Sequence, residues 1–187
     1  MKYISLDIET TSLDPQNGEI LEIGLVFDDL EVQKPLNELE RFRIVIRHRQ
    51  PVMCDLATIL FTNHKVIEDS VCGEDAIEYG DVIYDIQYFF FRCGFKIDEK
   101  ITLAGKNITM FDLPFLEACI PGWVETINPR LHSRIIDPAV SFLTCYDTEV
   151  PNLATCLYRA GFDSEVHHTA MEDVLAVVQL VRAALDQ

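Results

Sequence analysis

Two carboxylates stand two positions apart near the start of the chain, in the segment MKYISLDIETTSLDP. Successive residues of a strand face opposite sides, so a strand here places Asp7 and Glu9 on one face, about 6.6 Å apart at about 3.3 Å per residue. The opposite face carries Ile4, Leu6 and Ile8, which we expect to enter a core. Carboxylate oxygens in this arrangement can converge on one hard divalent cation. The end of this strand therefore predicts a metal site.

Two further acids and a histidine occur later in the chain, where they could reach the same place. Asp112 follows an apolar run and a polar loop in LAGKNITMFDLPFL, near a predicted helix start. Asp173 lies in the first turns of the last predicted helix, at the edge of its apolar stripe. Thr169 and Glu172 form a capping-box pattern, which makes Thr169 the predicted N-cap and leaves His168 just outside the helix. A single exposed acid is usually only solvated, but this set together indicates chemistry.

The same residues resemble the three ordered motifs of the DEDDh 3′-to-5′ exonucleases, which include proofreading exonuclease domains, oligoribonuclease and ribonuclease T. Asp7 and Glu9 in DIETTSLDP resemble the first motif. Asn107 and Asp112 in GKNITMFDLPFL resemble the second, and HHTAMEDVLAV resembles the third. The resemblance runs through essentially the whole chain, because the first motif opens it and the third lies in the last predicted helix.

The resemblance implies a site for two divalent metal ions, with Mg²⁺ as the expected ion and Mn²⁺ as a substitute. Asp7, Glu9 and Asp173 would hold the first ion, and Asp7 would bridge to the second. Asp112 would act largely through bound water. Oxygen ligands of this kind suit both ions.

A histidine would serve as general base for the attacking water. Histidine side chains ordinarily titrate near pH 6.5, so a neutral imidazole is available at physiological pH. Chemistry alone does not separate the adjacent His167 and His168, whereas the family spacing to Asp173 favours His168.

The resemblance also assigns contacts to the substrate. Thr10, Thr11 and Leu13 would contact the terminal nucleotide, with Leu13 against a base and the backbone near Thr10 meeting the 3′ hydroxyl; the residues alone indicate only a polar turn. Asn107 would either contact the sugar-phosphate or order its own loop, and both interpretations stay open. Lys106 departs from the family pattern, since many members have histidine before the asparagine.

The charge balance limits how such a protein could hold nucleic acid. The chain has 15 basic and 31 acidic residues and a formal net charge of −16, which argues against a broad cationic surface for long nucleic acid. Bound metal ions would supply local positive charge instead. The segment RFRIVIRHR at 41–49 alternates as a strand; we interpret its arginine face as solvated, with a nucleic-acid track as the alternative.

The order of the predicted elements favours an α/β fold with a mixed sheet, and the resemblance implies that this fold is RNase H-like. Three strands, at 2–8, 20–27 and 41–49, would pair antiparallel, and later strands at 101–104 and 134–136 would add in parallel. The predicted helices lie at 74–92, 111–119, 152–160 and 169–185. We expect residues 1–187 to form one domain. We also expect a cytoplasmic protein without a membrane partner, because neither a leader nor a bilayer-length apolar stretch occurs.

The residues and the family that they resemble together imply a metal-dependent 3′-to-5′ exonuclease. Its substrates would be 3′ ends of single-stranded DNA or short oligonucleotides, and its products nucleoside 5′-monophosphates. One alternative is an RNA-specific exoribonuclease, which shares the chemistry and differs in reading the 2′-hydroxyl. An alternative of another class is a catalytically silent module that binds nucleic acid or protein and uses the acids for a structural cation.

Overall fold

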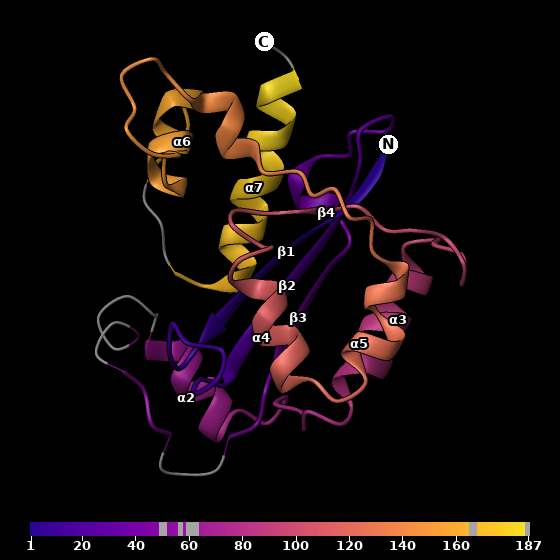
Figure 1. Ribbon diagram of the computed structural model, residues 1–187. Helices are drawn as coiled ribbons and strands as arrows, with labels where there is room; N and C mark the ends of the chain where they lie inside the picture. Colours follow the sequence, from indigo (N-terminus) through magenta and orange to yellow (C-terminus); the bar gives the residue numbers. More distant parts are fainter. Residues whose placement is uncertain (49–51, 56–57, 59–63, 165–167, 186–187) are drawn as a thin grey trace.

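A four-stranded mixed sheet forms the centre of the protein (Figure 1). The structure is a computed structural model, and it describes residues 1–48, 52–55, 58, 64–164 and 168–185. The strand order is β3-β2-β1-β4, in which β1 pairs antiparallel with β2, β2 antiparallel with β3, and β4 parallel with β1. The predicted fold class is therefore confirmed. The strands are β1 (Lys2–Thr10), β2 (Ile20–Asp29), β3 (Arg41–Val45) and β4 (Leu103–Ala104).

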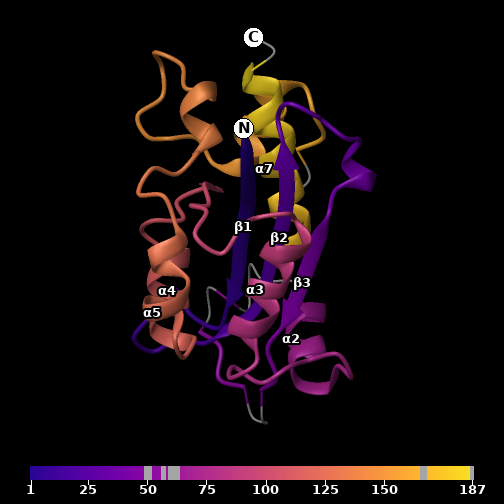
Figure 2. The same ribbon diagram turned by 90° about the vertical axis from the view of Figure 1, so that its right-hand side faces the viewer.

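Helices cover both faces of this sheet. Figure 2 shows α3 and α7 on opposite sides of it. In the described residues, no helix combines the length and the apolar character needed to cross a membrane. The helices are α2 (His64–Cys72), α3 (Val82–Arg92), α4 (Asp112–Cys119), α5 (Trp123–Thr126), α6 (Leu153–Ala160) and α7 (Ala170–Leu185), with the 3₁₀ helices η1 (Leu36–Glu38), η2 (Asn128–Arg130) and η3 (Pro138–Phe142).

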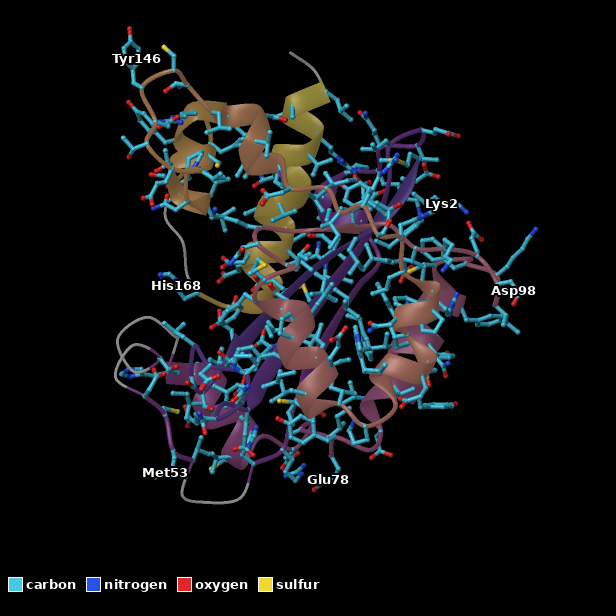
Figure 3. The ribbon with its side chains drawn as sticks, viewed as in Figure 1. Lys2, Met53, Glu78, Asp98, Tyr146 and His168 are labelled. Atoms are coloured by element: carbon cyan, nitrogen blue, oxygen red, sulfur yellow. The ribbon has the colours of Figure 1, made fainter. Side chains whose placement is uncertain are left out.

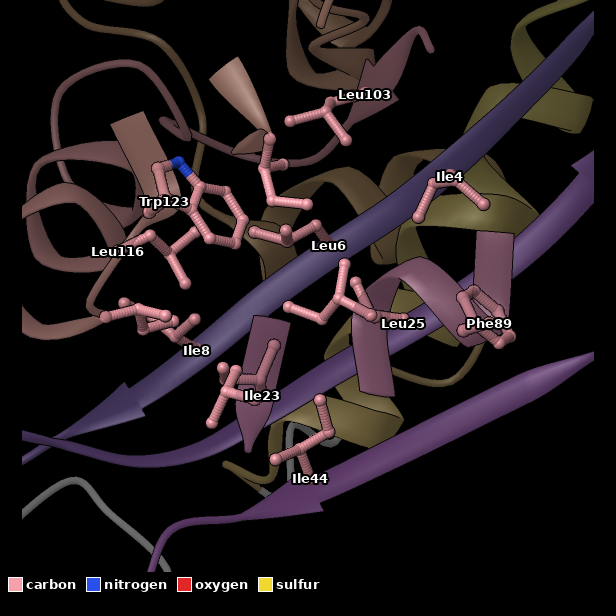
Figure 4. Packing of buried hydrophobic residues seen from close by; sticks show 14 of the residues in the cluster. Ile4, Leu6, Ile8, Ile23, Leu25, Ile44, Phe89, Leu103, Leu116 and Trp123 are labelled. Carbon is pink, nitrogen blue, oxygen red and sulfur yellow. The ribbon is translucent and has the colours of Figure 1, made fainter. Parts of the chain in front are cut away.

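Strand β1 separates the core from the candidate site by the alternation of its side chains. Ile4, Leu6 and Ile8 enter the main core, where residues of α3, α4 and α5 surround them (Figure 4). The other face lies against α7, and there the hydroxyl of Ser5 donates a hydrogen bond to the carbonyl of Val174 at 3.0 Å. The predicted division of β1 into two faces is confirmed, and Asp7 and Glu9 continue along the face that meets α7.

The N-terminal end of α7 rests directly on β2 because a glycine leaves room for it. Gly24 is the cross-strand partner of Asp7. A Cβ atom at Gly24 would lie 2.6 Å from the carbonyl carbon and oxygen of Ala170, the first residue of α7. This close approach brings Asp173, three residues further along the helix, toward Asp7.

The C-terminal part of α7 is held to the sheet by an ion pair. The carboxylate of Asp28 is fully buried and accepts hydrogen bonds from Arg182 Nε at 3.0 Å and Nη2 at 2.6 Å. The hydroxyl of Tyr3 donates to the same carboxylate at 2.8 Å. Breaking such a buried pair is costly because it leaves an uncompensated charge. Together with the contact at Gly24, the pair fixes α7 to the sheet at both ends of the helix.

Two helical predictions differ from the structure. The helix predicted over 74–92 begins at Val82, because the preceding residues include Ile77, which forms a parallel bridge with Ile46. Helix α2 was not predicted. It has nine residues, and Val66 is its one buried apolar residue in the described part.

Helix α3 carries four consecutive aromatic residues, and two of them enter the core. Phe89 and Phe90 are buried, whereas Tyr88 and Phe91 lie on the outer side of the helix. Four consecutive helical positions cannot share one face, which explains this division. The strand predicted at 134–136 is reduced to a single bridge between Ala104 and Ile136 in the described residues.

We predict that Gly24→Ala destabilises the protein by about 1–3 kcal/mol, because the added methyl group overlaps the backbone of α7. Urea unfolding followed by circular dichroism would measure this change. Gly80→Ala is the matched control: nothing lies within 4 Å of a Cβ at Gly80, so its effect should stay within about 0.5 kcal/mol. Equal stability of the two variants would contradict the proposed close packing.

Candidate active site

Three carboxylates from the two ends of the chain meet beside the C-terminal end of β1. Asp7, Glu9 and Asp173 each offer an oxygen, and these oxygens all lie within 4.8 Å of one another. All three residues are partly exposed. An all-oxygen donor set that solvent can reach fits a hard divalent cation. The structure therefore brings together the three acids that the sequence predicted as ligands of one ion.

Asp112, the fourth predicted acid, lies near the other three because it accepts a hydrogen bond from the edge of β1. Strand β4 pairs with β1 only at Ile4 and Ser5, so the backbone further along is open on that side. The Oδ1 atom of Asp112, at the first turn of α4, accepts a hydrogen bond from the N–H of Ile8 at 3.1 Å. Asp112 is only 2% exposed. A buried backbone donor needs such a partner, so the same contact completes the strand and positions the acid.

The acids strongly influence one another. Burial raises the pKa of Asp7 well above its usual range, and the charges of Asp112, Asp173, Glu9 and Glu22 raise it further. Burial also raises the pKa of Asp112 to about 8, although the backbone hydrogen bond from Ile8 acts in the opposite direction. Clustered carboxylates that ionise with such difficulty gain most from a bound cation, which would remove their mutual repulsion.

A fifth carboxylate, Glu22, was not singled out from the sequence. It is fully buried and lies directly opposite Glu9 across the β1–β2 pair. Its Oε2 accepts a hydrogen bond from Arg43 Nη2 at 2.8 Å, and the same nitrogen donates to Asp69 of α2 at 2.8 Å. Its Oε1 has no hydrogen-bond partner among the described residues. The available signal was an acid inside the otherwise apolar run ILEIGLV.

Arg43 and Arg47, on the strand predicted at 41–49, are engaged within the protein. Arg43 binds the two acids just described, and Arg47 donates to the carbonyl of Ala76. Of the four arginines in that segment, Arg49 lies outside the described residues. These contacts favour a structural use of Arg43 and Arg47 over a nucleic-acid track.

A cleft of about 400 Å³ opens on the side of the acids that faces α6. Asp137 was not predicted as a site residue. Its carboxylate accepts hydrogen bonds from the N–H of Asn107 at 3.3 Å and of Ala139 at 2.9 Å, so it ties the loop before α4 to the start of η3. The Asp-Pro sequence at 137–138 is a typical N-cap signal that could have located it. The cleft is lined by Asp7, Lys106, Asn107, Asp137, Val150, Leu153 and Asp173.

His168 stands immediately before α7 on the surface. Its backbone has a φ of 53°, in the left-handed region, and Figure 3 shows its side chain pointing outward from the chain leading into the helix. The predicted N-cap is confirmed, because the hydroxyl of Thr169 accepts the N–H of Glu172 at 3.3 Å and donates to its carboxylate at 2.9 Å. His167, the alternative general base, lies outside the described residues.

The turn after β1 is ordered by its own side chains. The hydroxyl of Thr10 donates to the carbonyl of Ser12 at 2.7 Å, and that of Thr11 accepts the N–H of Glu19 at 2.9 Å. Both threonines are buried. Leu13 differs, because its side chain is 65% exposed and therefore free to contact a ligand. Asn107 is exposed and has a φ of 59°.

Comparison with solved structures shows which known proteins share this fold. The zinc-bound form of the E. coli Exonuclease I complex with single-stranded DNA superposes with a TM-score of 0.68 at 14% identity. A second structure of Exonuclease I gives 0.71 at 12% identity, and Exonuclease I from Methylocaldum szegediense gives 0.66 at 16% identity. Each match covers 100% of this chain and 40% or 41% of the other.

The chain therefore has the fold of part of an exonuclease, and it spans about two fifths of the length of the Exonuclease I chains that it matches. No protein-family model matches the sequence. No curated protein matches it either. The likeness is thus one of structure rather than of overall sequence.

We predict that, in chelator, the thermal midpoint falls as the pH rises from about 5 to about 8. The pKa of Asp7 and of Asp112 is higher in the folded protein than in the unfolded chain, so the folded state binds more protons and loses stability through that interval. Scanning calorimetry at several pH values would measure the slope.

Asp112→Asn should flatten this slope while keeping an acceptor for the Ile8 N–H. Asp98→Asn is the control, because Asp98 is exposed on a distant loop (Figure 3). A midpoint that rises over the same pH interval would show that the folded acids do not resist ionisation.

Proposed function

We propose that this protein is a metal-dependent 3′-to-5′ exonuclease that hydrolyses the terminal phosphodiester bond of single-stranded DNA or of short oligonucleotides and releases nucleoside 5′-monophosphates. The observation that carries the proposal is the convergence of Asp7, Glu9 and Asp173, with Asp112 placed beside them through Ile8. The fold agrees, since its neighbours include Exonuclease I bound to single-stranded DNA.

One divalent ion would be held by Asp7, Glu9 and Asp173, and Asp7 would also be a ligand of a second ion. Such ions would lower the pKa of a bound water and would stabilise negative charge on the phosphate and on the departing 3′ oxygen. Mg²⁺ is the ion proposed, with Mn²⁺ as a substitute. Asp112 orients water in this arrangement, because its Oδ1 is fixed by Ile8 and its other oxygen can accept a hydrogen bond.

His168 is the proposed general base. It stands at the exposed start of the helix that carries Asp173, so its ring can approach a phosphate bound at the acids from the solvent side. There it takes a proton from the attacking water. A general base of this kind contributes about 10²–10⁴-fold to the rate.

Substrate recognition is proposed to use both sides of the acids. Leu13 packs its exposed side chain against the terminal base. The backbone of the turn at Thr10 and Thr11 contacts the terminal sugar, because the hydroxyls of both threonines already form hydrogen bonds within the turn. Asn107, on the opposite side, contacts the sugar-phosphate from the cleft.

We predict a ladder shortening from the 3′ end when matched 5′-labelled single-stranded DNA and RNA oligonucleotides are incubated with the protein and Mg²⁺ or Mn²⁺. Gel analysis should show that chelator abolishes the ladder. Asp7→Ala should lower the rate on the order of 1,000-fold or more, and His168→Ala about 100- to 10,000-fold. Asp98→Asn serves as the active control.

The faster polymer in this assay identifies the substrate class. If a ladder forms on RNA alone, the proposed function changes from a DNA exonuclease to an exoribonuclease with the same chemistry. An absence of cleavage on either polymer would contradict the proposed activity and favour a binding module.

Metal binding is testable without activity. We predict that Mn²⁺ raises the thermal midpoint of the wild-type protein by several degrees, since a ligand that binds only the folded state stabilises it. Asp173→Asn should lose most of this increase, whereas Asp98→Asn should keep it. Titration calorimetry with Mn²⁺ gives an independent measurement, and identical binding by Asp173→Asn and wild type would rule out the proposed ligand set.

A further inference from the structure

Lys106 is carried to the level of Asp7 by the pairing of β4 with β1. The parallel register places Ala104 beside Ser5, so the next residues of the two strands run on together. Gly105 lies so close to β1 that a Cβ there would be 2.6 Å from the carbonyl oxygen of Leu6. Its own N–H donates to the carbonyl of Ile136 at 3.0 Å, which holds it from the other side. The residue after Gly105 therefore enters the cleft next to Asp7.

Lys106 is the single cation among the described residues that line this cleft. Three of the other lining residues are acids: Asp7, Asp137 and Asp173. Despite these neighbours, the ammonium group of Lys106 forms no ion pair or hydrogen bond within the described part of the chain, whereas Arg43, Arg159 and Arg182 each bind a carboxylate. Its charge is thus available to a ligand.

The ammonium of Lys106 does not pair with the neighbouring acids of the cleft. Asp7 and Asp173 approach each other within 4.8 Å, yet neither forms an ion pair with Lys106. A phosphate bound at the acids would therefore leave Lys106 free for a second phosphate. Val150 and Leu153 add an apolar wall to the same cleft, which suits the sugar or base between two phosphates.

The loop that presents Lys106 is held in a fixed shape. Asn107 adopts a left-handed φ of 59°, and the N–H of Asn107 donates to Asp137. The carbonyl of Asn107 accepts the N–H groups of Met110 and Phe111, both at 3.1 Å. A loop that is already ordered loses little backbone entropy when its lysine binds an anion.

We propose that Lys106 binds the phosphate group one nucleotide to the 5′ side of the scissile bond, and that the cleft thereby prefers substrates with at least two phosphates. The proposal rests on the proposed exonuclease function. In a chain with a net charge of −16, one such contact would provide a substantial share of the attraction for the substrate backbone.

Two thymidine dinucleotides test this directly, because they differ only in the 5′-phosphate. In d(TpT) the sole phosphate is the scissile one, whereas d(pTpT) carries the second phosphate that Lys106 would bind. Each turnover releases one thymidine 5′-monophosphate and one thymidine from d(TpT), and two thymidine 5′-monophosphates from d(pTpT). Chromatography of these products, counted accordingly, gives KM and kcat for each substrate. For the wild type we expect a KM about tenfold lower on d(pTpT), the typical size of a charge-assisted hydrogen bond.

Lys106→Met should abolish the preference by raising KM on d(pTpT) alone, and Lys106→Arg should retain most of it. Lys96→Met is the matched control, since Lys96 is exposed and does not line the cleft. On longer single strands, Lys106→Met should lower the dependence of log KM on log salt by about one charge contact. Thermal midpoints would confirm that all variants are folded.

The outcomes separate the two proposals. Cleavage of neither dinucleotide by the wild type, together with no ladder on longer strands, would contradict the exonuclease function itself. Cleavage of both by the wild type without a preference for d(pTpT) would overturn the role of Lys106. Equal loss on both dinucleotides in Lys106→Met would also overturn it, because the lysine would then act at the scissile phosphate.

Discussion

Electrostatic repulsion among carboxylates is the constraint that the rest of the structure must offset. Asp7 is surrounded by four other acids, and burial and their charges together raise its pKa well above the usual range. Separating the elements that carry these acids would relieve the repulsion. The packing of α7 against Gly24 and the hydrogen bond between Asp112 and Ile8 prevent that separation. The hydrophobic core and the Asp28–Arg182 pair therefore stabilise an arrangement that the acids alone would not adopt.

Part of this charge is compensated within the protein. Arg43 neutralises Glu22 beneath the acids and ties α2 to the sheet through Asp69. A divalent cation bound at Asp7, Glu9 and Asp173 would offset the repulsion among these acids.

Local patterns in the sequence predicted the features that arise within a single strand or helix. The alternation along β1, the capping box at Thr169 and the periodicity of α7 are local, so the faces of Asp7 and Asp173 followed from them. Glu22 and Asp137 were missed because their importance arises from pairing between distant segments. The start of α3 was misplaced for the same reason, since a bridge to β3's continuation holds residues that are locally compatible with a helix. The proximity of Asp112 to Asp7 was expected, but its use as an edge partner for β1 was not.

The alternation along β1 also limits how this protein can change in evolution. Even-numbered residues from Ile4 to Ile8 build the core, and odd-numbered residues from Tyr3 to Glu9 meet α7 and form the acid cluster. Deleting or inserting one residue within the strand would exchange the two sets, turning aliphatic side chains toward solvent and carboxylates into the core. Substitutions can accumulate along β1 one at a time, whereas its length cannot vary. Conservation of spacing rather than of residues is thus compatible with a shared fold at 12–16% identity.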